Sequence, residues 1–63
     1  MALKEKREEK GVSRMDVAKA LDVDVSTVTR WEIGRVRPAS KHVRKLCLFF
    51  NCSADELWPE AQS

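Results

Sequence analysis

The segment VAKALDVDVSTVTRWEIG, residues 17–34, predicts two short helices joined by a tight turn. Val17 and Leu21 are four residues apart and give the first helix an apolar face. Val28 and Trp31 are three residues apart and face the core together from the second helix. The second helix is rich in β-branched residues, which are mediocre helix formers, so packing must hold it. We expect its remaining side chains to form a small polar surface that points outward.

Polar residues mark the ends of these two helices. Ser13 and Asp16 form an imperfect capping box at the start of the first helix. Asp24 is a good N-cap for the second helix, where its charge also suits the helix dipole. Gly34 is expected to end the second helix.

Three further helices are predicted on either side of this pair. Lys, Glu and Arg dominate the first segment of the chain, and Gly11 follows where a helix C-cap is expected. Val43, Leu46 and Phe50 follow the spacing of a buried helical stripe, and a capping box at Ser53 begins a last short helix. The expected helices cover about residues 2–10, 14–21, 25–33, 40–50 and 54–58.

Length and composition fit one compact all-α domain over residues 1–63. The chain is 43% hydrophobic and 35% charged, which suits a folded helical domain rather than a disordered tail. A chain this short rarely provides a catalytic cleft, so we expect no enzyme activity, no cofactor and no small-molecule ligand. No apolar run approaches the ~20 residues of a membrane span, and the charged N-terminus is unlike a signal peptide. We therefore expect a cytoplasmic protein that does not engage a membrane.

Basic side chains are concentrated in one part of the chain. Residues 30–45 hold six basic side chains and one acidic side chain, a net charge of +5, whereas residues 46–63 have a net charge of −3. Such asymmetry suggests one face turned toward a polyanion. A solvated charged loop would account for the same pattern, so charge alone leaves both interpretations open.

The two cysteines do not indicate a metal site. Cys47 and Cys52 lie in an apolar context, and with His42 they form an H-x4-C-x4-C set. That spacing fits none of the usual zinc patterns, and a fourth ligand is missing. A reducing cytoplasm also disfavours a disulfide, so we interpret both residues as thiols in or near the core.

The motif at residues 17–34, set among five helices in this order, resembles the lambda-repressor-like helix-turn-helix family. This family includes Cro proteins, phage repressors and XRE-type regulators, and the resemblance covers about residues 3–58. The resemblance is carried by Gly11, Ser13, Val17-Ala18, Leu21, Val23, Ser26 to Glu32, Gly34, Pro38, Ser53 and Asp55-Glu56-Leu57. It implies that the second helix of the motif enters the major groove of double-stranded DNA, which is about 12 Å wide.

The resemblance assigns base contacts to four positions of that helix, namely Val25, Ser26, Thr29 and Arg30. Arg30 is the strongest candidate, because its guanidinium fork can bind N7 and O6 of guanine together. Val25 suits a thymine methyl group, whereas Ser26 and Thr29 donate or accept and predict little about sequence. A solvent or phosphate contact remains the alternative role for Arg30.

Phosphate contacts are expected on either side of the base-reading helix. The resemblance assigns them to Arg14, Thr27, Arg35, Arg37 and Lys41. Helix N-termini would add backbone N–H donors to the same phosphates. For each of these side chains, a role in solubility alone is the alternative.

Two further positions have structural roles under the resemblance. The acid that matches Glu32 in many relatives pairs with an arginine on the first helix, and Arg7 stands at that position here. Asp22 replaces a frequent turn glycine, so a positive φ is expected at a residue that tolerates it better than most.

Leu48, Phe49 and Trp58 are candidates for a dimer surface. Leu48 stands where relatives usually carry an exposed polar residue, and Phe49 stands where they carry a small one. Exposed apolar patches often mark interfaces, and a two-fold dimer would place two recognition helices about one DNA turn, ~34 Å, apart. Alternatively, the three residues complete a small core.

The leading hypothesis is a sequence-specific transcriptional regulator encoded by a bacterium or phage. It would be a Cro-like or XRE-type repressor that binds a palindromic operator as a homodimer. The alternative hypothesis is a protein-interaction module, such as an antitoxin-like adaptor with secondary DNA binding. Arg30→Ala separates the two, because it should relax base preference only in the first case.

Overall fold

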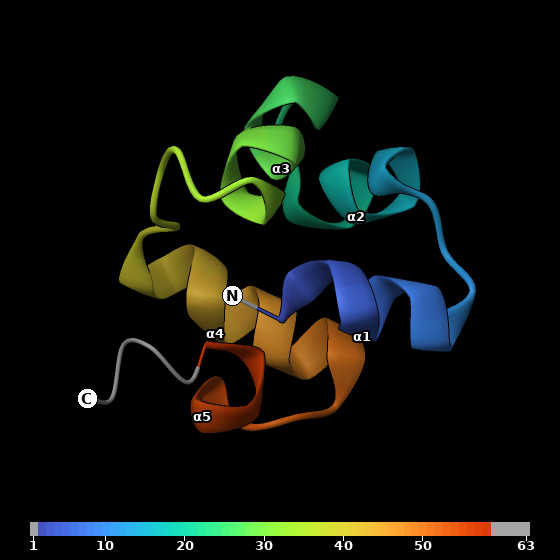
Figure 1. Ribbon diagram of the computed structural model, residues 1–63, viewed down its shortest axis with the longest axis vertical. Coiled ribbons are helices and arrows are strands. Elements are labelled where there is room, and N and C mark those ends of the chain that lie inside the picture. The colour runs from blue at the N-terminus through green and yellow to red at the C-terminus, as the bar shows by residue number, and fades with distance from the viewer. Residues whose placement is uncertain (1, 59–63) are drawn as a thin grey trace.

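The computed structural model describes residues 2–58, which form five helices and no strand. The helices are α1 (Leu3–Lys10), α2 (Arg14–Leu21), α3 (Val25–Glu32), α4 (Ser40–Phe50) and α5 (Ala54–Leu57). α2 and α3 lie at one end of the molecule, α5 lies at the other, and α1 and α4 lie between them (Figure 1). The all-α prediction is confirmed, and the expected bounds differ from the observed ones by one residue at α1, α3 and α5. The domain expected over residues 1–63 also includes residues 1 and 59–63, which lie outside the described part.

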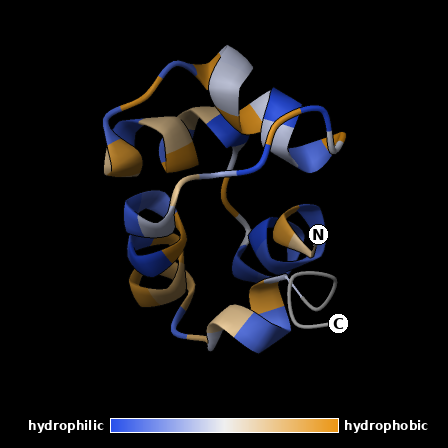
Figure 2. Cartoon of the chain, turned by 90° about the vertical axis from the view of Figure 1, so that its left-hand side faces the viewer, coloured by the Kyte–Doolittle hydropathy of each residue, from blue (hydrophilic) through white to orange (hydrophobic). Residues whose placement is uncertain are grey.

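One apolar core joins the five helices. Every helix contributes to it, and α1 does so through Leu3 alone. Apolar and polar residues alternate along the helices, as expected where each helix buries one side (Figure 2). The start of α1 is closed against the end of α5, because the Ala2 N–H donates to the Leu57 carbonyl at 2.8 Å. The buried apolar residues are Leu3, Val17, Ala18, Leu21, Val28, Trp31, Leu46 and Leu57.

The capping box predicted for α2 is present. The Asp16 N–H donates to the Ser13 hydroxyl at 3.0 Å, and the Ser13 N–H donates to the Asp16 carboxylate at 2.9 Å. At α3 the prediction was wrong in part, because Asp24 occupies the N-cap position but its side chain makes no capping hydrogen bond. Its backbone carbonyl instead accepts the N–H groups of Thr27 and Val28, so α3 begins without a side-chain cap.

Two non-glycine residues adopt the left-handed conformation at helix ends. Asp22 ends α2 with φ +58°, as expected for the residue that replaces a turn glycine. Asn51 ends α4 with φ +52°. Asn and Asp visit this region more readily than other L-residues, because their short polar side chains can bond locally. The left-handed turn at Asp22 sets the direction in which α3 leaves α2.

The capping box predicted at α5 is only half formed. The Glu56 N–H donates to the Ser53 hydroxyl at 3.2 Å. The Glu56 carboxylate instead pairs with the Lys6 ammonium of α1 at 3.5 Å, which explains why it does not return to Ser53. Within residues 2–58, no helix is long and apolar enough to cross a membrane.

Candidate nucleic-acid interface

The two faces of α3 differ in the way the sequence predicts. Val28 and Trp31 are 0% and 2% exposed, so they anchor the helix in the core. Ser26 and Arg30 are exposed on the other side, and Val25 at the first turn is 38% exposed. The side chains that are candidates for base contacts therefore stand on the outer surface of a helix held from behind.

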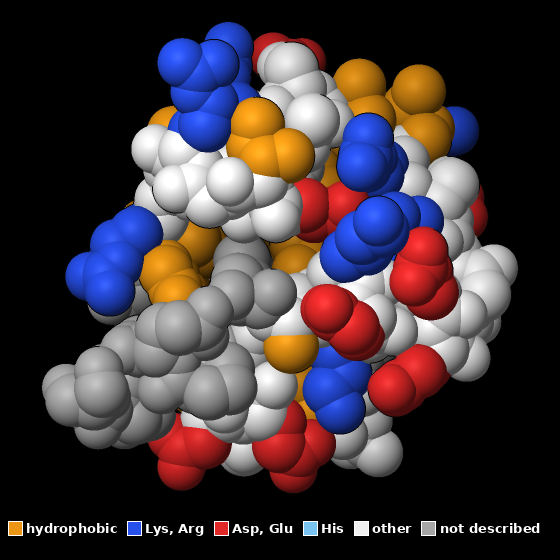
Figure 3. Space-filling view, viewed as in Figure 1, with side chains coloured by type: hydrophobic (Ala, Val, Ile, Leu, Met, Phe, Trp, Pro, Cys, Tyr) orange, Lys and Arg blue, Asp and Glu red, His pale blue; other side chains and the backbone are white. Residues whose placement is uncertain are grey.

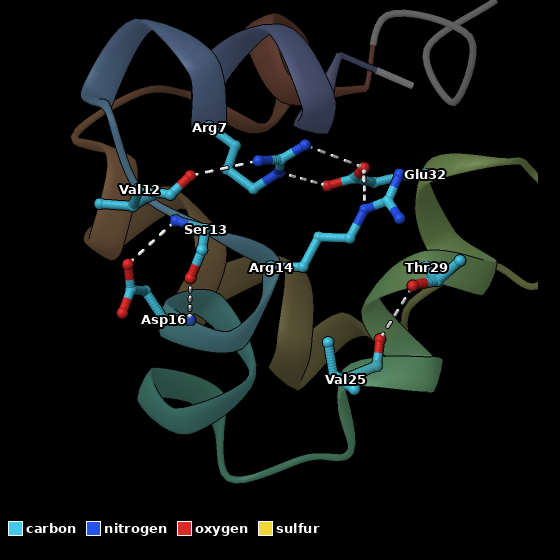
Figure 4. Close-up of polar contacts among 8 residues, drawn as sticks. All are labelled: Arg7, Val12, Ser13, Arg14, Asp16, Val25, Thr29 and Glu32. Carbon is cyan, nitrogen blue, oxygen red and sulfur yellow. Dashed lines mark hydrogen bonds and ion pairs between the residues drawn. The ribbon is translucent and has the colours of Figure 1, made fainter.

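Thr29 is more restricted than its sequence position suggested. It is half-buried, and its hydroxyl donates to the Val25 carbonyl at 3.1 Å (Figure 4). A hydroxyl that donates its hydrogen bond within the helix can only accept a hydrogen bond from another partner. Thr29 can thus accept from a base amino group but is not available as a donor.

A single carboxylate ties three helices together behind this surface. Glu32, at the end of α3, has a side chain that is only 2% exposed. The Arg7 Nε of α1 lies 2.8 Å from Glu32 Oε2, which is the ion pair that the resemblance implied. Arg7 also donates from Nη1 to the Val12 carbonyl at 3.2 Å (Figure 4). The hydrogen bond to Glu32 is the main cause that raises the pKa of the Arg7 guanidinium.

Arg14 joins this ion pair, which the sequence did not predict. Its Nε lies 3.0 Å from Glu32 Oε1, and its side chain is 41% exposed (Figure 4). The sequence had indicated only a contact with a DNA phosphate for Arg14. The residue instead contacts Glu32 while much of its side chain still faces solvent.

The other candidates for phosphate contacts fall into three groups. Arg35 and Lys41 are exposed, as an open electrostatic contact requires, whereas Thr27 is half-buried. Arg37 is exposed but its guanidinium carbon lies 4.9 Å from the centre of the Trp58 ring, within the range of a cation–π contact. Arg37 therefore connects the loop after α3 to the residue that follows α5.

The three residues predicted as a dimer surface do not form one exposed patch. Leu48 is 77% exposed on α4. Phe49 is half-buried against the core, in an edge-to-face contact with Phe50 at 4.9 Å between ring centres. Trp58 is half-buried and lies against Arg37. Of the three, only the Leu48 side chain is accessible to a partner, because the other two side chains pack against residues of the same chain.

The residues considered for metal binding have other surroundings. Cys47 and Cys52 are free, half-buried thiols beside the core, and burial is the main cause that raises the pKa of Cys52. His42 packs against the Trp31 ring, with 5.3 Å between ring centres. No group of three metal-ligating side chains is found within residues 2–58.

Several exposed apolar side chains were missed by the sequence reasoning. Met15 is 51% exposed at the start of α2, next to Arg14. Ile33 and Val36 are 59% and 48% exposed in and beside the loop that follows α3. Their positions outside the buried helical stripes were the available signal, since apolar residues off the stripe tend to face solvent.

The basic and acidic side chains are partly separated on the face drawn in Figure 3. Lys and Arg side chains stand out at the upper left of Figure 3, beside α3 and the loop after it. Asp and Glu side chains line the lower edge, around α5, and others lie at the top and across the middle of this face. Residues 35–45, which follow α3, carry five basic side chains and no acidic one, so this segment is the part that would attract a polyanion.

Five short helices, with a tight-turned pair whose second helix presents a polar outer face, define a helix-turn-helix DNA-binding domain. A helix-turn-helix family model matches residues 3–57, and the chain belongs to the XRE or lambda-repressor-like helix-turn-helix family. It is thus a DNA-binding regulator of this family. Neither the search of curated proteins nor the search of solved structures gave a match.

Proposed function

We propose that this protein is a Cro-like or XRE-type transcriptional repressor that binds a specific double-stranded DNA operator through α3. The observation that carries the proposal is the separation of the two faces of α3. Val28 and Trp31 are buried, whereas Ser26 and Arg30 are exposed. The major groove admits one α-helix, so this outer face can reach base edges. Occupation of an operator by the protein would block polymerase.

The four outer residues of α3 have different roles in the proposal. Arg30 binds guanine N7 and O6 in a bidentate way, a contact worth about 1–3 kcal/mol of discrimination. Val25 meets a thymine methyl group, and Ser26 bonds either kind of base. Thr29 accepts from a base amino group, because its proton is already donated to the Val25 carbonyl.

Phosphate contacts give affinity in the proposal without reading sequence. Arg35 and Lys41 are exposed and contact the backbone directly, Thr27 adds a hydroxyl, and Arg37 contributes its charge from beside Trp58. Each neutralised phosphate releases counterions, so log K should fall against log salt with a slope of about −0.9 per phosphate.

The proposed assembly on DNA is a homodimer with a palindromic site, in the cytoplasm of a bacterial or phage-infected cell. Leu48 supports it, because a leucine that is 77% exposed on α4 gives a second copy an apolar contact. Figure 1 shows α4 extending away from the end of the molecule that carries α3. To read both halves of a palindromic site, two copies related by a two-fold axis would need their α3 helices one DNA turn, ~34 Å, apart.

Selection of bound sequences from a random duplex pool tests the proposal. We expect enrichment of one half-site that contains guanine and thymine, repeated as an inverted pair. A pool that remains random after repeated rounds would contradict sequence-specific binding. An adaptor protein with secondary DNA binding would give that second result.

Arg30→Ala tests whether Arg30 contacts a base in the selected site. We expect it to relax base preference at one position and to lower affinity by about 1–3 kcal/mol. Arg44→Ala is the matched control, because Arg44 is also exposed but lies on α4. Equal losses in the two variants would show that Arg30 supplies only charge.

A further inference from the structure

Arg14 and Arg7 share one carboxylate but stand in different surroundings. Arg7 is 14% exposed and uses Nε and Nη2 on Glu32 and Nη1 on the Val12 carbonyl. Arg14 is 41% exposed and contacts Glu32 through Nε at 3.0 Å. The single negative charge of Glu32 faces two positive charges, so the group retains one net positive charge. That excess lies on the outer side, with Arg14.

The contact through Nε leaves the outer edge of the Arg14 guanidinium available. An arginine has five N–H groups in a planar fork, and only one of them is on Nε. Within the described residues, Nε of Arg14 has a hydrogen-bond partner and the two Nη atoms have none. The two Nη groups are the ones that a phosphate binds side by side.

The position of this edge relative to α3 follows from helical spacing. Val25, Thr29 and Glu32 are separated by four and three residues, so they form one row along α3. Arg14 reaches from the first turn of α2 to the end of that row (Figure 4). The first turn of α2 also presents backbone N–H groups and the positive end of the helix dipole.

We propose that Glu32 is a positioning residue for DNA binding, which holds Arg14 so that its Nη edge meets a phosphate beside α3. The inference rests on the proposed function, and it adds a role for a buried carboxylate that never touches DNA. A free arginine loses side-chain freedom when it binds, whereas one already fixed at Nε loses less. Fixing Arg14 in the unbound protein therefore favours the bound state.

Arg14→Lys separates this role from that of charge alone. Lysine keeps the positive charge but has no Nε–H and no planar fork, so it cannot bind Glu32 and a phosphate in the same way. The Arg7–Glu32 pair stays intact, so the variant should fold. Arg35→Lys is the matched control, because Arg35 is exposed in the loop that follows α3.

Affinity for the selected duplex should be measured by fluorescence anisotropy at several salt concentrations, well below the unfolding temperature. We expect Arg14→Lys to weaken binding about tenfold with an unchanged salt slope, and Arg35→Lys to weaken it by about twofold or less. Arg14→Gln should weaken binding further and reduce the salt slope by about 0.9, the value for one phosphate.

Three outcomes would overturn the inference. In the first, Arg14→Lys is as mild as Arg35→Lys and only lowers the unfolding temperature, which would make Arg14 purely structural. A salt slope unchanged in Arg14→Gln would show that Arg14 meets no phosphate. Failure of the unaltered protein to bind any duplex would overturn the proposed function as well, so the two failures are distinguishable.

Discussion

At the scale of the residue, Glu32 shows how one buried side chain can link three helices. It accepts from Arg7 at 2.8 Å and from Arg14 at 3.0 Å, and its side chain is 2% exposed. A buried charge is stable only when it is paired and hydrogen-bonded. Within residues 2–58 every buried side-chain nitrogen or oxygen has a hydrogen-bond partner, so the buried atoms of this cluster are satisfied.

We expect Glu32→Gln to be the most destabilising conservative substitution in the chain. It leaves two guanidinium groups facing a neutral amide, and breaking a buried pair costs about 3–5 kcal/mol. Urea denaturation measures the free energy of unfolding. Glu56→Gln is the control, because the Glu56 side chain is 58% exposed and its pair with Lys6 should contribute less than about 1 kcal/mol. Equal losses in the two variants would argue against a buried network.

Asp16 should make stability depend on pH. Hydrogen bonds from Ser13, chiefly its backbone N–H, lower the pKa of Asp16 in the folded state. A lowered folded pKa gives stability that is present above the unfolded value of about 3.9 and is lost as pH falls through the folded value. Asp16→Asn should therefore lower the unfolding temperature at pH 7 but approach the unaltered protein at about pH 2. Thermal circular dichroism at both pH values checks this, and a pH-independent difference would contradict it.

At the scale of the element, the turn between α2 and α3 fixes the orientation of α3 relative to α2. Asp22 holds this turn in the left-handed region at φ +58°. Its N–H donates toward the Ala18 and Lys19 carbonyls, which closes the end of α2. An L-residue in this conformation has an energetic cost that glycine does not have.

Asp22→Gly should raise the free energy of unfolding by about 0.5–1 kcal/mol, because glycine adopts this φ without strain. Asp22→Val should lower it by about 1–2 kcal/mol, since a β-branched side chain is poorly tolerated there. Ala20→Gly is the control inside α2, where glycine should be destabilising by about 1 kcal/mol. Chemical denaturation of the three variants gives the comparison. A loss of stability in Asp22→Gly would show that the Asp side chain, and not the backbone, decides this turn.

Local elements were predictable from the sequence, whereas contacts between elements were not. The helices and the Ser13–Asp16 capping box depend on residues a few positions apart, so periodicity and cap chemistry indicate them. Arg14–Glu32 and Arg37–Trp58 depend on how helices and loops meet in space. The Arg7–Glu32 pair was expected only through the family resemblance. Prediction from the sequence was also limited at short range, since Asp24 stands at the N-cap position of α3 but its side chain makes no capping hydrogen bond.

At the scale of the whole molecule, the proposed DNA surface and the proposed dimer contact lie on different elements. α3 presents Ser26 and Arg30, and α4 presents Leu48. Because the two are separate, a substitution at one should leave the other intact. The sequence indicated an apolar surface formed by Leu48, Phe49 and Trp58, but Phe49 and Trp58 pack against other residues of the fold.

Leu48→Glu should weaken dimer formation without unfolding the protein. The side chain is 77% exposed, so a carboxylate there stays hydrated in the monomer but would be buried in a dimer. We expect at least tenfold weaker binding to the palindromic duplex and nearly unchanged binding to a single half-site. Analytical ultracentrifugation on each duplex measures the stoichiometry. Unaltered two-to-one binding by this variant would place the dimer contact elsewhere.

The outward face of α3 is tested most directly by an NMR titration of the 15N-labelled protein with a duplex that carries one selected half-site. We expect the largest amide shifts in residues 25–30 and in the first turn of α2, with little change in α5. A half-site is used because it cannot assemble two copies through Leu48. Shifts centred on α4 and α5, with residues 25–30 unaffected, would contradict recognition through α3.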